Sequence, residues 1–412
     1  MVPYTTAESF NPEDLWKWMA RYEEATGGQV LALAHNGNMS NGIMFPVETN
    51  PATGKPLSKD YAKQRARWEP LYETTQIKGD GETHPLLSSD DEFADYETLA
   101  LGNLNLTVVK EDSMLQYEYT REALKNGLKL EAELGTNPYK FGLVGSSDTH
   151  TALAAVEEDN YIGKHAGTEP SPERWNHPMA KFEGRQYEGY AMASSGYAGV
   201  WATDNTRKAL FDAMKRKEVY GTTGPRMLVR FWGGWDFVEE DAKGRLPAAV
   251  GYAKGVPMGG ELNKAEDKKS PTFLVAALKD PYGANLDRIQ IVKGWLDKDG
   301  KTREKVYDVV WGDAENRKPD DKGKLPAVGN TVDVENATWT NTIGDPELIS
   351  TWQDPDFDPS MRAFYYARVI EIPTPRWTAY DAKRFGVKMS KEVEMITQER
   401  AYTSPIWYTP GS

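Results

Sequence analysis

The sequence contains no cysteine and only five histidines among its 412 residues. The absence of cysteine excludes disulfide bonds, thiolate metal ligands and cysteine nucleophiles, and it is compatible with either the cytoplasm or the periplasm. No apolar run approaches the roughly 20 residues that a membrane-spanning helix needs, so no integral membrane segment is predicted. The first residues also lack the basic and apolar regions of a signal peptide.

Basic residues are too few for a nucleic-acid-binding surface. The chain has 49 Lys and Arg against 62 Asp and Glu, a net charge of −13. This excess of acid argues against nucleic acid and anionic membranes as partners. A nucleophile elbow, a Walker A motif and a dinucleotide-binding glycine pattern are absent too, which disfavours serine hydrolases, kinases and dehydrogenases. The expected partner is a small-molecule substrate, and a homo-oligomer is left open.

Length and patterning indicate two regions. A chain of 412 residues exceeds one ordinary core. In the first half, caps and apolar stripes predict helices over 11–27, 58–69 and 113–134. Short apolar strands follow the first and third of these helices, and this alternation is typical of an α/β fold. Thirteen Trp and twenty-one Tyr suit core packing or a carbohydrate site.

After residue 226 the pattern changes to short runs rich in β-branched and aromatic residues, separated by turn residues. Such spacing predicts an antiparallel β-sandwich-like domain over 227–412, packed on the first region. The runs are Met227–Phe231, Thr272–Leu278, Ile289–Val292, Lys305–Val310 and Phe364–Ile370.

Candidate metal ligands follow two of the apolar strands. The run from Phe141 leads into Asp148 and His150, which would share one side if the strand continued through them. A second run, Gln29–Ala34, leads into His35. Imidazole and carboxylate donors suit Zn²⁺, Mn²⁺ or Fe. The sequence therefore predicts a divalent-metal site made by His35, Asp148 and His150.

Several longer motifs carry a family resemblance. The chain resembles the DUF3604 family, a branch of the PHP (polymerase and histidinol phosphatase) superfamily, over nearly its whole length. The resemblance implies an α/β fold with a PHP-like (β/α) barrel and a metal centre. The matching stretches are Asn-Gly-Asn-Met-Ser-Asn-Gly (36–42), Gly-Asp-Gly-Glu-Thr-His-Pro (79–85), Gly-Ser-Ser-Asp-Thr-His (145–150), Glu-Glu-Asp-Asn-Tyr (157–161), Thr-Thr-Gly-Pro-Arg (222–226) and Tyr-Thr-Ser-Pro-Ile-Trp-Tyr-Thr-Pro (402–410).

The chain departs from this family pattern at its start. PHP-like proteins open with a His-x-His motif, and none of the five histidines here forms one. The sequence therefore resembles the C-terminal part of a family member. We expect residues 1–226 to form an incomplete barrel that carries the remaining metal motifs. A signal peptide and further ligands would belong to the missing segment, so the compartment is left open.

Four further residues are candidates for substrate contact. In the metal-site reading, Asn36 and His84 would orient the substrate or leaving group. The resemblance implies that the loop with Glu82 and His84 contacts substrate or supplies an outer metal ligand. Arg226 could bind an oxyanion, because a guanidinium matches phosphate bidentately. The alternatives are a surface turn at 79–85 and a domain-junction ion pair at Arg226.

The predicted function is metal-dependent hydrolysis of a phosphoester or related ester by a metal-activated water. The truncated chain could be inactive if the upstream ligands are required. The alternative is a non-catalytic carbohydrate- or ligand-binding protein built on a barrel remnant and a β-domain. Glycoside hydrolysis by paired carboxylates is a third reading, since acidic residues are plentiful.

Overall fold

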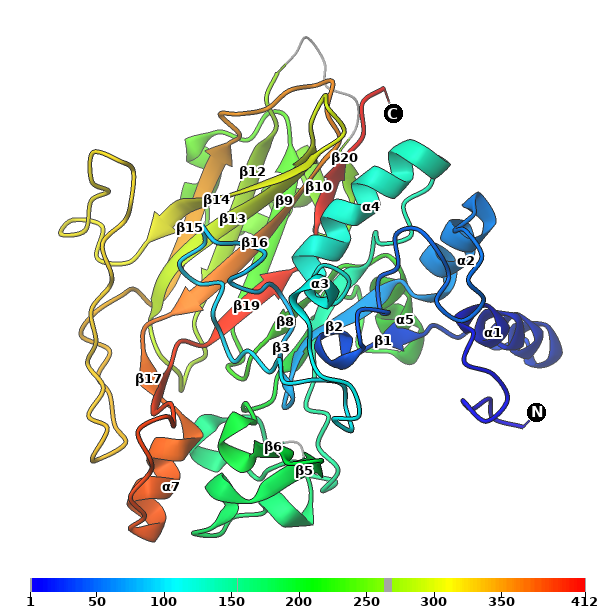
Figure 1. Ribbon diagram of the computed structural model, residues 1–412. Helices are drawn as coiled ribbons and strands as arrows, with labels where there is room; N and C mark the ends of the chain where they lie inside the picture. The colour runs from blue at the N-terminus through cyan, green and yellow to red at the C-terminus, as the bar shows by residue number, and fades with distance from the viewer. Residues whose placement is uncertain (1, 154, 263–268, 412) are drawn as a thin grey trace.

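The computed structural model describes residues 2–153, 155–262 and 269–411 (Figure 1). Over these ranges the chain has seven α-helices and several β-sheets, and none of the sheets closes on itself. The predicted α/β class is confirmed, whereas the finer barrel assignment stays a prediction. No helix within these ranges is long and apolar enough to cross a membrane.

The N-terminal region is a small parallel layer with helices preceding its strands. Strand β2 lies in the centre, with β1 and β4 parallel to it on either side and β3 antiparallel at its end. The first two predicted helices begin and end where their caps lie. Asn11 and Ser58 cap α1 and α2, and Gly27 ends α1 in the left-handed conformation. The bounds are α1 (Pro12–Thr26), β1 (Leu33–Ala34), α2 (Lys59–Trp68), β2 (Leu71–Gln76), β3 (Gly79–Asp80) and β4 (Gly142–Gly145).

The long helix predicted over 113–134 is interrupted. It forms α3 (Asp112–Leu115) and α4 (Thr120–Leu134), with Tyr119 between them in an extended conformation. The reason is tertiary. The backbone N–H groups of Thr120 and Arg121 donate to the carbonyls of Gly81 and Glu82, at 2.8 and 2.9 Å. These bonds tie the start of α4 to the β3 loop, so helical periodicity alone does not set the boundary.

Two larger sheets pack face to face beyond this layer. Phe273 of one sheet and Tyr365 of the other lie 4.5 Å apart between ring centroids, in a core that both sheets share. The predicted runs are all strands, several of them longer than expected. The four-stranded sheet has the order β10 (Gly255–Pro257), β9 (Leu228–Gly234), β12 (Thr272–Leu278), β15 (Glu347–Gln353). The eight-stranded sheet contains β7 (Tyr197–Val200), β8 (Val219–Thr222), β11 (Glu261–Leu262), β13 (Leu286–Leu296), β14 (Thr302–Trp311), β16 (Ala363–Glu371), β19 (Arg400–Thr403) and β20 (Ile406–Tyr408).

Strands β7 and β8 connect the two regions. Strand β7 is antiparallel to β8, and β8 pairs with β19. Glycine lets β8 cross closely over β4: a Cβ atom on Gly221 would meet the Gly145 nitrogen at 2.5 Å. Strands from both sides of residue 226 thus share one sheet, and the domain boundary there stays a prediction.

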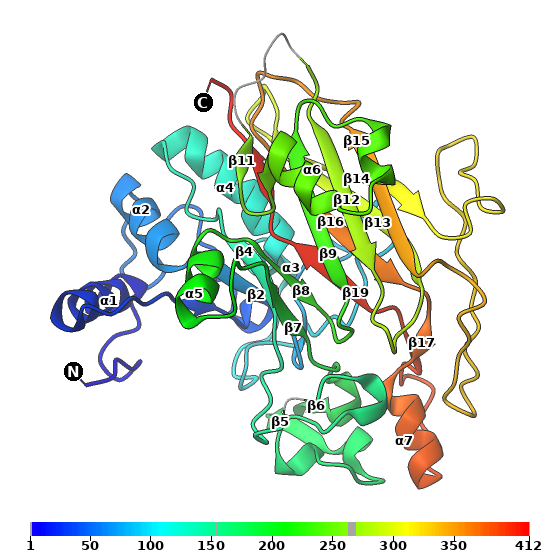
Figure 2. The same ribbon diagram turned by 180° about the vertical axis from the view of Figure 1, so that it is seen from behind.

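The remaining elements cover the edges of this core. Figure 2 shows α6 over the outer face of the four-stranded sheet. The β5–β6 hairpin and α7 lie together at one end (Figure 1), where Trp377 stacks on Tyr161. Their bounds are β5 (Pro178–Phe182), β6 (Arg185–Glu188), α5 (Arg207–Lys215), α6 (Pro247–Lys254), β17 (Thr374–Pro375), α7 (Trp377–Phe385) and β18 (Ile396–Thr397).

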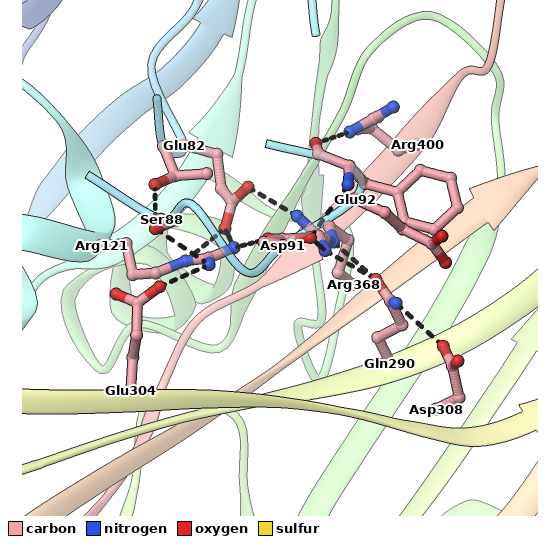
Figure 3. A network of polar contacts seen from close by, with 12 residues as sticks. Glu82, Ser88, Asp91, Glu92, Arg121, Gln290, Glu304, Asp308, Arg368 and Arg400 are labelled. Carbon is pink, nitrogen blue, oxygen red and sulfur yellow. Dashed lines mark hydrogen bonds and ion pairs between the residues drawn. The ribbon is translucent and has the colours of Figure 1, made fainter. Parts of the chain in front are cut away.

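A buried ion network joins the parallel layer to the eight-stranded sheet (Figure 3). Arg121 of α4 donates to Glu82 at 3.0 Å and to Asp91 at 2.8 Å. Arg368 of β16 donates to the other oxygens of the same two carboxylates, at 3.0 and 2.7 Å. Burial alone would raise the pKa of Asp91, but the two guanidiniums hold it well below its usual range.

Neutral and charged groups of β13, β14 and β16 complete this network. Gln290 accepts from Arg368 at 2.9 Å, Glu304 accepts from Arg121 at 3.1 Å, and the Tyr366 hydroxyl donates to Glu82. Both arginines are fully buried, and the carboxylates that they share lie far from either arginine in the sequence. The loss of one arginine would leave carboxylates buried without a counter-charge, which is far more costly than the loss of a surface pair.

We therefore expect Arg121→Met to lower the free energy of unfolding by about 3–5 kcal/mol. Urea unfolding of the purified chain measures this. The control is Lys208→Met, which removes an exposed pair with Asp212 and should cost under about 1 kcal/mol. Equal midpoints for the two variants would show that the network does not stabilise the fold.

Candidate functional site

Polar side chains gather where the three parallel strands end. Strand β1 leads into His35, β2 carries Glu73 and leads to Lys78, and β4 leads into Ser146 and Asp148. Because parallel strands present their carboxyl ends at one edge, residues far apart in sequence meet there. We call Glu73, Lys78, Asp148 and Lys164, together with His35 and His150, the edge cluster.

Glu73 of β2 is the buried acid in the part of the edge cluster next to β1. Its Oε1 atom accepts a hydrogen bond from the Ser146 hydroxyl, and its Oε2 atom lies 3.4 Å from Nδ1 of His35. The His35 side chain is 48% exposed, and its other nitrogen, Nε2, lies 3.4 Å from the side-chain nitrogen of Asn36. Asn36 lies beside this ring and accepts from Gln76 at 2.8 Å. The ring of His35 thus faces a carboxylate at ion-pair distance.

Asp148 has a conformation that the strand pattern did not predict. Strand β4 ends at Gly145, and Asp148 has a left-handed backbone with φ of 45°. The expectation that a strand would place residues 148 and 150 on the same side is therefore wrong. The Asp148 side chain is only 13% exposed, whereas that of His150 is 62% exposed. The backbone carbonyl of Asp148 explains part of this geometry, because it accepts from Lys164 and lies 3.1 Å from Nδ1 of His150.

Two lysines that sequence reasoning missed converge on Asp148. Lys78 and Lys164 both pair with its Oδ2 atom, the latter at 2.8 Å. Burial and the charge of Lys164 lower the pKa of Lys78 to about 7. The pKa of Lys164 is lowered by burial, and that of His150 is lowered chiefly by the charge of Lys164. Two ammonium groups thus lie where a cation would meet the Asp148 carboxylate.

Some donors for a metal ion lie in the edge cluster, but they are not gathered around one point. Across the part of the chain that the structure describes, no three His, Asp or Glu side chains form a group that could hold an ion as they stand. The chemistry of the donors nevertheless suits a divalent ion. His35 and His150 each direct Nδ1 at a protein oxygen, the usual arrangement when Nε2 is the metal ligand.

The residues of the 79–85 loop have partners of their own. Glu82, expected to contact substrate, is fully buried and belongs to the ion network with Arg121 and Arg368. His84 accepts from the Leu86 backbone N–H at 3.2 Å, and burial lowers its pKa. Its ring packs edge-on against Tyr119, 5.4 Å away. The substrate roles of Glu82 and His84 stay predictions.

Arg226 is engaged by acidic residues. Its side chain, 57% exposed, pairs with Asp280 at 3.3 Å and with Glu157 at 3.7 Å, and its backbone N–H donates to Asp280 at 2.7 Å. These contacts are those of the ion-pair alternative. Binding of an oxyanion by Arg226 stays a prediction.

Comparison with known proteins gives a family and no activity. No curated protein and no solved structure matches the chain. The family model described as "Protein of unknown function (DUF3604)" matches residues 1–410, nearly the whole sequence. The motifs that suggested this resemblance include the segments that deliver His35, Asp148 and His150 to the edge cluster. The chain therefore belongs to the DUF3604 family.

Proposed function

We propose that the chain is a metal-dependent hydrolase of a phosphoester or related ester, acting at the edge cluster. The observation that supports this most is the pairing of Asp148, which lies beside His150, with two buried lysines after the ends of parallel strands. Titratable groups with strong mutual interactions cluster at functional sites more than elsewhere.

In this proposal His35, Asp148 and His150 would hold the ion through Nε2 and carboxylate oxygens. A divalent ion at such donors lowers the pKa of a bound water to roughly 7 and so supplies hydroxide at neutral pH. Glu73 would keep the His35 ring in place through Nδ1, as carboxylates commonly do for histidine ligands. Further ligands from an upstream His-x-His segment, which the family resemblance implied, stay a prediction.

The lysines have a role in both states of this site. Without an ion, Lys78 and Lys164 neutralise Asp148, and their ammonium groups compete with any cation. If Asp148 held an ion, the two ammonium groups would lose this partner. They would then be available to the oxygens of a phosphoryl group, whose negative charge they stabilise. The same lysines would thus regulate metal affinity and bind substrate.

Metal retention tests the ligand assignment. The purified chain is incubated with Mn²⁺, Zn²⁺ or Fe²⁺, freed of unbound metal and subjected to elemental analysis. We expect the wild-type chain to retain metal and Asp148→Ala to retain none, because the central carboxylate is gone. Lys164→Met should retain more than wild type, since one competing ammonium group is removed.

Arg226→Ala is the control for this experiment, because Arg226 pairs with Asp280 and Glu157 and not with the proposed ligands. It should retain as much metal as wild type. Unchanged metal content in Asp148→Ala would show that the assignment of the site is wrong.

Hydrolysis of bis(p-nitrophenyl) phosphate and p-nitrophenyl phosphate tests the reaction. We expect Lys164→Met to slow turnover of the metal-loaded chain by roughly a hundredfold, the usual effect of removing one group that stabilises transition-state charge. Lys208→Met, at an exposed position of α5, should leave turnover unchanged. Urea unfolding of both variants checks that the loss is not one of folding.

A metal-loaded wild-type chain that hydrolyses neither ester would contradict the phosphoesterase proposal. Retention of metal together with ligand binding but no turnover would then favour the non-catalytic alternative.

A further inference from the structure

A second site lies at the end of the eight-stranded sheet, apart from the residues of the edge cluster. It is a cavity of about 220 Å³ between the residue 156–159 segment, the Gly224–Arg226 turn, the residue 280–284 turn and the ends of β16 and β17. Six of its lining residues are acidic and, among the described lining residues, Arg226 is the one basic side chain. We call it the acidic cavity. The acids are Glu157, Glu158, Asp159, Asp280, Glu371 and Glu399.

Most of the buried acids here have protein partners. Asp280 accepts from the Arg226 backbone at 2.7 Å and from the Tyr282 backbone at 3.0 Å. Glu399 accepts from the Tyr96 hydroxyl at 3.1 Å and from the Thr223 hydroxyl. Glu158 accepts from the backbone N–H of Trp377. These three acids therefore have hydrogen-bond donors within the protein and need none from a ligand.

Glu371 differs from these acids. It is the last residue of β16, its side chain lines the cavity and it is only 1% exposed. Its Oε1 atom has no hydrogen-bond partner among the described residues. A carboxylate oxygen buried without a donor costs far more than an ordinary lost hydrogen bond. A donor brought by a ligand would remove this cost.

The lining decides which class of ligand supplies the donor. An anion is disfavoured because the single guanidinium already pairs with Asp280 and Glu157. A divalent metal ion would leave the apolar wall of the cavity without a contact. Pro225, Trp339 and Tyr380 add apolar and aromatic wall, which suits the hydrocarbon part of a ligand and the face of a cation.

We propose that the acidic cavity binds a small organic ammonium ion, whose N–H donates to Oε1 of Glu371 and whose hydrocarbon part lies against Trp339 and Tyr380. The volume suits a molecule smaller than a typical drug-sized ligand, whose pockets begin at about 300 Å³. The residues of this site differ from those of the proposed hydrolase site, so the two proposals are tested independently.

Protonation of the acids determines whether ligand affinity rises or falls with pH. Burial and the nearby Asp280 raise the pKa of Glu371 well above its usual value, and burial raises that of Glu399 to about 7. An acid with a raised pKa keeps its proton at every pH below that pKa. A bound cation favours the ionised form of the acid instead. Binding therefore releases protons, and affinity rises as pH rises through about 7. The charged or titratable groups facing these two acids are Glu97, Glu158, Asp280, Lys279, Tyr96 and Arg226.

Calorimetric titration of the full chain with butylammonium chloride tests the proposal. We expect saturable binding, tighter at pH 8 than at pH 6 by about tenfold for the release of one proton from a group with a pKa of about 7. Butan-1-ol and butyrate, of equal length but neutral or anionic, should bind at least about ten times more weakly, and so should Ca²⁺, since a factor of ten is about 1.4 kcal/mol. Butyrate or butan-1-ol binding as tightly as butylammonium would overturn the proposal, and so would Ca²⁺ binding without butylammonium binding.

Two variants locate the ligand. Glu371→Gln should weaken butylammonium binding at least about tenfold, the loss of one charged partner, whereas the exposed control Glu239→Gln should not change it. Arg226→Ala should tighten binding, because it removes the competing cation without touching Glu371. Unchanged binding in Glu371→Gln, or weaker binding in Arg226→Ala, would contradict the proposed site. The second variant decides the matter if Glu371→Gln does not fold.

Discussion

The two arginines that share Glu82 and Asp91 hold the parallel layer on the eight-stranded sheet. Each guanidinium bonds to both carboxylates, so the two pairs close a ring of four charges within the protein. Such a ring is stable only when every member is present, because any charge left alone would be buried without a partner. The position of the 82–91 loop, the start of α4 and the middle of β16 are therefore fixed together. The edge cluster lies on the layer that this ring fixes.

At the edge cluster the buried charges also have partners, but the pairing is less complete. Asp148 is held by two ammonium groups, while Glu73 is shared between the Ser146 hydroxyl and His35. The site is open on the side of the two histidines, whose side chains are about half exposed or more. A left-handed backbone at a non-glycine residue costs free energy, although Asp and Asn tolerate it better than most residues. Asp148 has such a backbone. The cluster thus combines strain, buried charge and access to solvent.

Sequence reasoning located the helices whose caps are local and the metal-motif residues that follow apolar strands. Asn11 and Ser58 cap helices as their side-chain chemistry predicts. It missed β2, although Leu-Tyr-Glu-Thr-Thr-Gln is rich in strand-forming residues, and Glu73 and Lys78 were missed with it. Lys164 lies in an irregular segment where no period marks a buried side chain. The partners of Glu82 come from residues 121 and 368, and no local pattern encodes such distant pairing.

Three buried glutamates illustrate how partners, and not burial alone, separate structure from function. Glu82 has two guanidiniums and a tyrosine hydroxyl, so its charge is satisfied within the fold. Glu73 accepts from a hydroxyl at Oε1, while its Oε2 atom has no hydrogen bond among the described residues and only a half-exposed imidazole 3.4 Å away, so part of its environment is open to change. Glu371 has one oxygen with no donor among the described residues, beside a cavity. An unpaired buried carboxylate must bind a proton or a cation. From Glu82 to Glu73 to Glu371, the protein supplies fewer partners, and the need for a proton or a cationic ligand increases. The last of them makes the strongest case for a ligand, although it belongs to none of the motifs that suggested a function.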